Sequence, residues 1–242
     1  MDAIQLNGLT KQYNNIVAVD HLSFRVKEGE LFSLLGVNGA GKTTTIKMLS
    51  CLTVPTEGDA CLFGHSIRTE AAAVKAMIAV SPQETAVARG LSARENLELM
   101  CGVHGFSKDK RTAKVREVTD LLGLQSILDR KAGKLSGGWQ RRLSIAMALI
   151  SEPKILFLDE PTLGLDVLAR SELWDVIRAL KGKVTVILTT HYMEEADALS
   201  DRIAIMKDGK LLVCDTPAEI KRMTGTEDME QAFIRTVKEG NV

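Results

Sequence analysis

The stretch GVNGAGKTT, residues 36–44, follows the apolar run LFSLL (31–35) and precedes TIKMLSCL (45–52), which has helical spacing. It fits the pattern G-x-x-x-x-G-K-T, with Gly36, Gly41, Lys42 and Thr43 at the fixed positions. A loop of this kind between a strand and a helix presents converging backbone N–H groups and one cation to a phosphate chain. The stretch therefore predicts an α/β fold that binds a nucleotide at this turn.

The residues of this loop have separate predicted roles. Glycine at 39 and 41 lets the backbone bend so that successive N–H groups converge. Lys42 is expected to reach the β- and γ-phosphates, the Thr43 hydroxyl to bind Mg²⁺, and Thr44 to reach the α-phosphate. The predicted nucleotide-binding residues of the loop are Gly36, Asn38, Gly39, Ala40, Gly41, Lys42, Thr43 and Thr44.

A bound metal and an attacking water both need an acid, and the segment KILFLDE (154–160) supplies two. Asp159 ends an apolar strand, which is the usual place for the metal-orienting acid. Glu160 leaves the strand and is expected to act as general base toward the attacking water. Two solvent-facing acids at a strand end are the alternative interpretation, and the phosphate loop argues against it.

Composition limits the class of protein. The 242 residues carry 31 Lys+Arg and 31 Asp+Glu, so no nucleic-acid partner is expected. The four cysteines fit no zinc or haem spacing and are expected to be free thiols in a reducing compartment. The first residues, with an acid at position 2 and no apolar stretch, are not expected to act as a secretory signal, and no apolar run approaches the roughly 18 residues of a membrane span. The protein is expected to be soluble by itself, so any work at a membrane requires another chain that spans it.

The order of elements predicts the architecture. Segments 3–10 and 17–26 indicate antiparallel strands that lead into a central strand at 31–36. Short apolar segments at 77–81, 154–160 and 184–191 indicate buried parallel strands joined by helices. Residues 202–215 indicate a hairpin that turns on Asp208-Gly209.

Residues 84 to about 135 have helical spacing instead. Ser92 and Glu95 form a capping box, and a helix is expected to stop at Gly123. The tail predicts a short amphipathic helix, with Thr226 before its first turn. We therefore expect an α/β core with its β region in residues 1–83 and 136–242. The helical subdomain, 84–135, is inserted in this core.

The tetrapeptide LSGG (135–138) predicts a second anion site. Ser136 is a good N-cap, and Gly137 and Gly138 open a helix, so its N-terminus favours an anion. One nucleotide needs one such cradle in each chain. The economical arrangement is a homodimer in which each LSGG covers the γ-phosphate held by the other chain's glycine loop.

With these motifs in this order, the chain resembles the ATP-binding cassette (ABC) ATPases over essentially its whole length. The resemblance implies a P-loop NTPase parallel-sheet core with an N-terminal antiparallel β region and an inserted α-helical subdomain. It also implies Mg²⁺-dependent hydrolysis of ATP. Ser136, Gly137 and Gly138 match the family's signature and would bind nucleotide. Trp139 stands where glutamine is common, and its role stays open.

The resemblance assigns further residues. Tyr13 matches the aromatic that stacks on adenine, although an edge-strand aromatic is the alternative. Gln83 matches the glutamine that orients Mg²⁺ with Thr43 and Asp159. His191 matches the γ-phosphate sensor and completes a catalytic set with Glu160 and Lys42. Asp166 matches a loop that contacts the partner subunit, a role compatible with a simple helix N-cap.

Two segments indicate the branch of the family. LSARENLELMCGVHGF (91–106) and the residues from 189 to 221 resemble the exporters of drugs, antibiotics and sodium. This implies a separate transmembrane permease subunit and a peripheral location at the cytoplasmic face of the membrane. A soluble ABC ATPase acting on ribosomes or nucleic acid is one alternative, and a nucleotide-binding regulator without turnover is another. Intact Glu160 and His191 argue against the latter.

Overall fold

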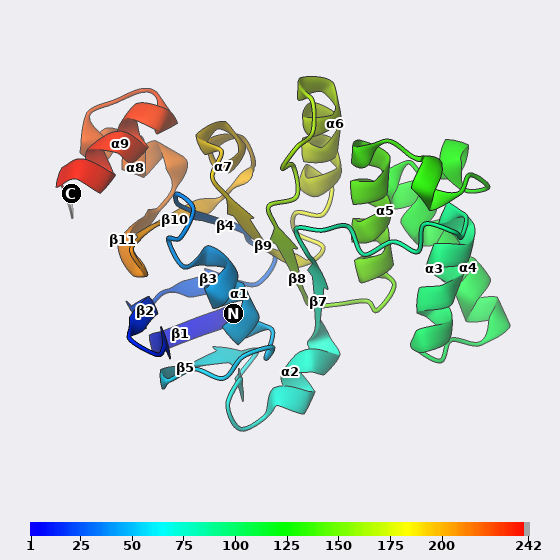
Figure 1. Ribbon diagram of the computed structural model, residues 1–242, viewed down its shortest axis with the longest axis horizontal. Coiled ribbons are helices and arrows are strands. Elements are labelled where there is room, and N and C mark those ends of the chain that lie inside the picture. Colours follow the sequence, from blue (N-terminus) through cyan, green and yellow to red (C-terminus); the bar gives the residue numbers. More distant parts are fainter. Residues whose placement is uncertain (240–242) are drawn as a thin grey trace.

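The computed structural model describes residues 1–239 and contains the predicted parallel sheet (Figure 1). Its strand order is β11-β10-β4-β9-β8-β7, and every pair from β10 to β7 is parallel. β11 pairs antiparallel with β10 through a turn at Asp208 and Gly209, whose φ angles of 48° and 79° suit a tight hairpin. The strands are β4 (Leu31–Leu35), β7 (Ile78–Ser81), β8 (Ile155–Asp159), β9 (Thr185–Thr190), β10 (Arg202–Lys207) and β11 (Lys210–Asp215).

Both faces of this sheet are buried. Along β8, Leu156 and Leu158 belong to one hydrophobic cluster, whereas Ile155 and Phe157 belong to another on the opposite face. Residues that alternate along a strand point to opposite faces, so a strand covered on both sides must be apolar throughout. This explains why the parallel strands are continuous apolar runs in the sequence.

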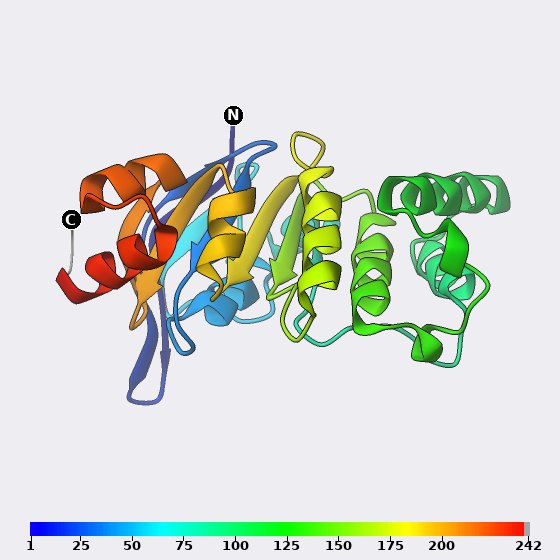
Figure 2. The same ribbon diagram turned by 90° about the horizontal axis from the view of Figure 1, so that it is seen from above.

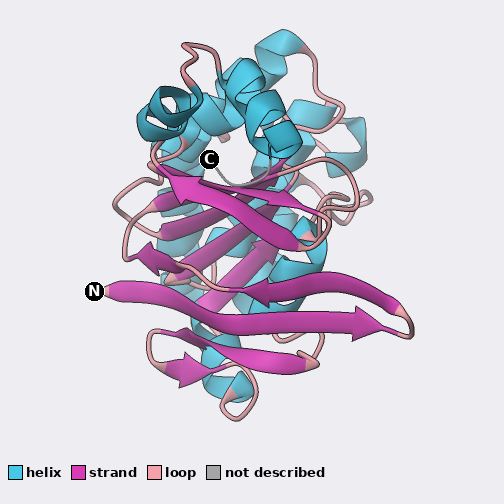
Figure 3. Ribbon diagram, turned by 90° about the vertical axis from the view of Figure 1, so that its left-hand side faces the viewer, coloured by secondary structure: helices cyan, strands magenta, loops and turns pink. Residues whose placement is uncertain are grey.

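A second, antiparallel sheet lies against the first (Figure 3). Its order is β2-β1-β5-β6, with β3 also paired to β1. The predicted strand 17–26 is divided in two, because Ser23 and Phe24 belong to neither β2 nor β3, while His21, with a φ of 48°, lies within β2. β5 and β6 were not predicted, since Gly, Asp and Ala are poor strand formers. The strands are β1 (Asp2–Tyr13), β2 (Ile16–Leu22), β3 (Arg25–Lys27), β5 (Glu57–Leu62) and β6 (His65–Ser66).

Helix α1 (Lys42–Leu49) lies between the two sheets. Its Ile46, Met48 and Leu49 share a cluster with side chains from β1, β5, β8 and β9. This packing holds α1 in place at the end of β4. Because the glycine loop joins β4 to α1, its position is fixed as well. Helix α2 (Ala71–Met77) includes Met77, so β7 begins one residue later than predicted.

The secondary structure between β7 and β8 is helical and forms one end of the molecule (Figures 1 and 2). Both hydrogen bonds of the predicted Ser92–Glu95 capping box are present, and Gly123 ends α4 with a φ of 65°. Helix α5 packs on α3 and α4 in the same cluster. The helices are α3 (Ala93–Val103), α4 (Lys108–Leu122) and α5 (Gly137–Leu149), with single 3-10 turns at Gln125–Ile127 and Ala132–Lys134.

The remaining helices cover the other face and end of the parallel sheet. These are α6 (Val167–Arg178), α7 (Met193–Leu199), α8 (Pro217–Thr224) and α9 (Met229–Glu239). The predicted tail helix is present and is capped by Asp228, whose carboxylate accepts from Gln231 N at 2.9 Å. Among residues 1–239, no helix combines the length and apolarity that crossing a membrane requires.

The acid Glu195 of α7 is completely buried beside α6. Trp174 Nε1 donates to its Oε1 at 3.0 Å, while Glu195 Oε2 and the Thr162 hydroxyl have no partner within the described residues. Burial raises the pKa of Glu195, although the nearby Thr190 and Thr162 hydroxyls and the hydrogen bond from Trp174 act in the opposite direction. Folding therefore shifts the pKa of this carboxyl upward relative to that of an exposed glutamate.

Glu195→Gln is expected to stabilise the fold at pH 8. Because folding raises the pKa of this carboxyl, its contribution to the stability of the fold is fully present below its pKa in the unfolded chain, about 4.5. That contribution is lost as the pH rises through its pKa in the folded protein. The neutral amide keeps an acceptor for Trp174 and adds a donor for Thr162. One gained hydrogen bond of about 1 kcal/mol corresponds to a rise of about 2–4 °C in Tm.

Thermal unfolding of the wild type and of Glu195→Gln, measured at several pH values, tests this prediction, with the exposed Glu194→Gln as control. An equal difference at pH 4 and pH 8 would contradict the burial argument.

Candidate functional site

The glycine loop joins β4 to α1 and leaves the start of that helix open. Gly39 and Gly41 have φ angles of 85° and 100°, in the left-handed region that favours glycine. A Cβ on Gly41 would meet Ala18 O at 2.5 Å, and one on Gly36 would meet Met206 O at 2.5 Å. No side chain caps α1. The first N–H groups of the helix therefore face the loop as an anion site.

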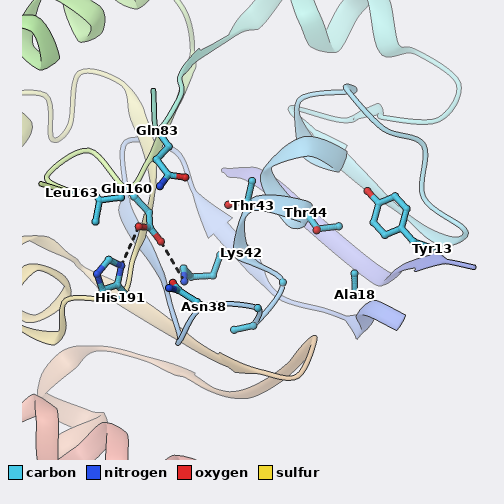
Figure 4. A pocket seen from close by; sticks show the side chains of 13 residues that line it. Tyr13, Ala18, Asn38, Lys42, Thr43, Thr44, Gln83, Glu160, Leu163 and His191 are labelled. Atoms are coloured by element: carbon cyan, nitrogen blue, oxygen red, sulfur yellow. Dashed lines mark hydrogen bonds and ion pairs between the residues drawn. The ribbon is translucent and has the colours of Figure 1, made fainter. Parts of the chain in front are cut away.

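A cavity of about 560 Å³ opens at this loop (Figure 4). It gathers side chains from β1, the loop, the end of β7, the end of β8 and the end of β9. Ala18 and Leu163 also line it, and no signal in the sequence predicted them. The predicted site residues around it are Tyr13, Asn38, Gly39, Ala40, Gly41, Lys42, Thr43, Thr44, Gln83, Glu160 and His191.

Lys42 is held in this cavity by main-chain oxygens and one acid. Its side chain is 5% exposed, and Nζ donates to Gly36 O at 2.7 Å and to Val37 O at 3.3 Å. Glu160 Oε1 lies 3.6 Å from the same nitrogen. Burial lowers the pKa of Lys42, and the charges of Glu160 and Asp159 oppose that change. The ammonium is thus poorly hydrated, which strengthens its attraction for an anion.

Asp159 ends β8 and connects the glycine loop to β9. Its Oδ1 accepts from the Thr43 hydroxyl at 3.2 Å and from the Thr189 hydroxyl at 2.5 Å. Figure 4 shows the Gln83 amide pointing into the same cavity. Hydroxyl, carboxylate and amide oxygens suit Mg²⁺, which binds through one or two carboxylates together with substrate phosphates.

The described chain, residues 1–239, holds no group of three or more His, Cys, Asp or Glu side chains placed to bind a metal. Thr43, Asp159 and Gln83 offer oxygen donors for part of a coordination shell, which suits an ion that takes its remaining ligands from phosphate and water. They do not fit a cage made of protein ligands alone.

Glu160 lies between Lys42 and His191, as the dashed lines in Figure 4 show. Its φ of 47° turns the chain sharply after β8, and its N–H donates to Thr189 O and to the Thr189 hydroxyl. His191 Nδ1 lies 3.0 Å from Glu160 Oε2. The carboxylate accepts, so Nδ1 carries the proton. The side chain of Glu160 is 11% exposed and that of His191 is 29% exposed, which leaves both accessible from the cavity.

The LSGG segment lies apart from this cavity. Ser136 is the N-cap of α5, yet its hydroxyl makes no cap bond, and Ser136 and Gly137 are exposed. Gly137 instead borders a second cavity of about 370 Å³ that also includes Gln83, Gly164 and Leu165. The structure therefore does not bring Ser136, Gly137 and Gly138 to the glycine loop of the same chain.

Three further residues from the sequence have defined surroundings. Tyr13 is 44% exposed, with Lys11 Nζ 4.9 Å from its ring centroid. Trp139 is half-buried against the helical cluster under the Arg142 guanidinium, 4.8 Å from its ring. Asp166 caps α6, since its Oδ1 accepts from Ala169 N at 2.9 Å.

Comparison with known proteins gives a consistent result. Residues 19–163 match the family model described as ABC transporter. The daunorubicin/doxorubicin resistance ATP-binding protein DrrA of Streptomyces peucetius is 43% identical over 225 residues, which cover 93% of this chain and 68% of DrrA. The probable multidrug ABC transporter ATP-binding protein YbhF of Escherichia coli is 38% identical over 97% of this chain, but the match covers only 41% of YbhF.

Solved structures agree with the fold. The structure of an ATP-binding subunit of an ABC transporter has a TM-score of 0.84 and 26% identity, covering 98% of this chain and 100% of its own. A dimeric post-hydrolysis state of an ATP-binding cassette bound to ADP and Pi has a TM-score of 0.77 and 28% identity, covering 88% and 98%.

Proposed function

Because this chain belongs to the ABC transporter family, we propose that it binds Mg²⁺-ATP at the glycine loop and hydrolyses it. The energy released would drive a separate membrane-spanning subunit. The observation that carries the proposal is the position of Glu160, whose carboxylate lies between Lys42 and His191 beside an open helix N-terminus. A base, a cation and an anion cradle thus meet in one cavity.

Substrate binding is assigned to the loop and to Tyr13. The backbone N–H groups of residues 38–44 and the Lys42 ammonium would hold the β- and γ-phosphates, with Thr44 at the α-phosphate. Tyr13, at the rim of the same cavity, would stack on adenine. Thr43, Asp159 and Gln83 would hold Mg²⁺, which when bound neutralises charge on the phosphate oxygens.

Hydrolysis is assigned to Glu160 and His191. Glu160 would take a proton from water as the water oxygen bonds to the γ-phosphorus and the bond to the β-phosphate oxygen breaks. ADP and inorganic phosphate then leave. His191 contacts the carboxylate at 3.0 Å through Nδ1, and as an imidazolium it would also donate from Nε2 toward the γ-phosphate. The main-chain bonds of Glu160 to Thr189 fix the base relative to β9.

The signature segment is assigned to the partner's nucleotide. Ser136 has a free hydroxyl at an exposed helix N-terminus that is outside its own nucleotide cavity. An equivalent chain placed head to tail would present this end to the γ-phosphate. That one of the similar solved structures is a dimer with bound ADP and Pi supports this arrangement.

Export is the proposed work of the assembly. DrrA and YbhF are both described as ATP-binding proteins, of drug resistance and of a multidrug transporter respectively. We place this chain likewise at the cytoplasmic face of a membrane, bound to a permease. Expression with a candidate permease tests this: ATP turnover should rise with the complex in membranes, whereas turnover without any association with the permease would contradict it.

Lys42→Ala is expected to weaken ATP binding by about 10- to 100-fold, because a charge-assisted hydrogen bond is worth about 1.5–3 kcal/mol. The buried position of Lys42 makes this loss larger than that of a surface charge. Titration with a fluorescent ATP analogue measures the affinity. Lys47→Ala, which removes an exposed lysine from the same helix, is the control. A change below twofold at Lys42 would remove it from the cradle.

A further inference from the structure

Arg141 of α5 is a buried cation whose guanidinium makes no ion pair. Arg141 is 5% exposed, and among the described side chains its guanidinium pairs with no carboxylate, only with main-chain oxygens. Burial lowers the pKa of Arg141, and the more distant charge of Asp159 opposes that change. Burying an unpaired charge is unfavourable, and an apolar side chain of similar volume is often neutral or more stable. Its presence therefore points to a use other than packing.

The partners of Arg141 are two successive main-chain carbonyls. Nη1 donates to Pro82 O at 2.7 Å and Nη2 donates to Gln83 O at 2.5 Å. These carbonyls belong to the peptide groups on either side of the Gln83 Cα. One rigid guanidinium therefore fixes both peptide planes next to Gln83, and with them the direction of its side chain.

Within residues 1–239, no secondary structure holds the peptide groups around Gln83, so Arg141 is what fixes them. β7 ends at Ser81, and the chain from residue 82 to residue 92 has no helix or strand. In the described residues, neither Pro82 O nor Gln83 O accepts a main-chain hydrogen bond. Ser144, one turn further along α5, bonds to Ser81 at 3.0 Å and holds the strand end itself. One face of α5 therefore holds both the end of β7, through Ser144, and the peptide groups around Gln83, through Arg141.

We propose that Arg141 is a positioning residue that holds Gln83 in the nucleotide cavity by clamping the two peptide groups around it. The inference rests on the proposed function of this cavity as a Mg²⁺-ATP site. Arg141 is not among the residues that line the nucleotide cavity. It connects the helix that begins at the signature to the residue that reaches the metal site.

A double-mutant cycle on the full chain tests this. Arg141→Gln removes the two guanidinium hydrogen bonds to the Pro82 and Gln83 carbonyls. It is expected to lower ATP turnover by about 10- to 100-fold, which is the effect of losing one charge-assisted hydrogen bond. In the Gln83→Ala background the same change should cost less than about twofold, because neighbours that act through one group are not additive. Arg142→Gln is the matched comparison. Its guanidinium bonds to Glu172 of α6, so its effect, whatever its size, should be the same in both backgrounds.

Two further measurements separate positioning from packing. The Mg²⁺ concentration for half-maximal turnover should rise in Arg141→Gln, and Arg141→Lys should restore turnover only in part, because an ammonium lacks the planar fork. Arg141→Lys keeps the test valid if Arg141→Gln is unfolded. The proposal is overturned if the fold-losses in ATP turnover of Arg141→Gln and Gln83→Ala multiply in the double variant. It is also overturned if Arg141→Gln lowers Tm while the Mg²⁺ dependence of turnover stays that of the wild type. Absence of turnover in the wild-type protein would instead contradict the proposed function.

Discussion

Glu160→Gln is expected to lower ATP turnover by about 10²- to 10⁴-fold, the usual contribution of a general base, while ATP binding persists. The amide has the shape of the carboxylate but cannot accept a proton from water. It can still bond to His191, which lies 3.0 Å from the carboxylate in the structure. The cavity should therefore keep its form and lose its base.

The variant should also accumulate as an ATP-bound dimer, since hydrolysis is what separates the two chains in the proposed arrangement. Phosphate release and elution volume with and without Mg²⁺-ATP measure the two effects. Glu227→Gln, an exposed acid outside the cavity, is the control and should behave as the wild type. Turnover close to that of the wild type would remove Glu160 from its assigned role.

Ser136→Arg is expected to lower turnover by at least about 10²-fold, the effect of losing one donor to a charged transition state. The reason is that the exposed helix N-terminus at Ser136 would be blocked by a long side chain. ATP binding to the monomer should be nearly unchanged, because Ser136 is outside the cavity of its own chain.

Nucleotide titration at low protein concentration, beside a turnover assay, separates the two properties. Ser126→Arg places the same side chain at another exposed serine of the helical region and serves as control. A loss of monomer affinity in Ser136→Arg would show that the signature serves the nucleotide of its own chain. The arrangement between two chains would then be wrong.

Much of this architecture could be predicted because its determinants are local. Buried parallel strands are apolar on both faces, so β4, β8 and β9 are visible as continuous runs. The loop at 36–44 requires glycine where φ is positive, and Gly39 and Gly41 meet that requirement. β5 was missed because its stability comes from pairing with β1, and its Gly58 and Asp59 carry no strand preference.

In the site, the residues at strand ends could be predicted from the sequence, whereas the contacts that hold them could not. Sequence order gives Asp159, Glu160 and His191 as the ends of neighbouring strands, so their meeting could be expected from the parallel sheet. The contacts of Arg141 could not, because they join residues 59 and 58 positions apart through main-chain oxygens that have no sequence pattern. The burial of Glu195 against Trp174 was hidden for the same reason.

The central claim is that each ATP is hydrolysed between the glycine loop of one chain and the signature of another. Mixing Ser136→Arg protein with Lys42→Ala protein tests it most directly. A mixed dimer would have one site with an intact Lys42 and an intact Ser136, and one site with both residues replaced. ATP turnover of the mixture should clearly exceed the sum of the two separate variants. A mixture that forms dimers with ATP yet shows only that sum would contradict the claim.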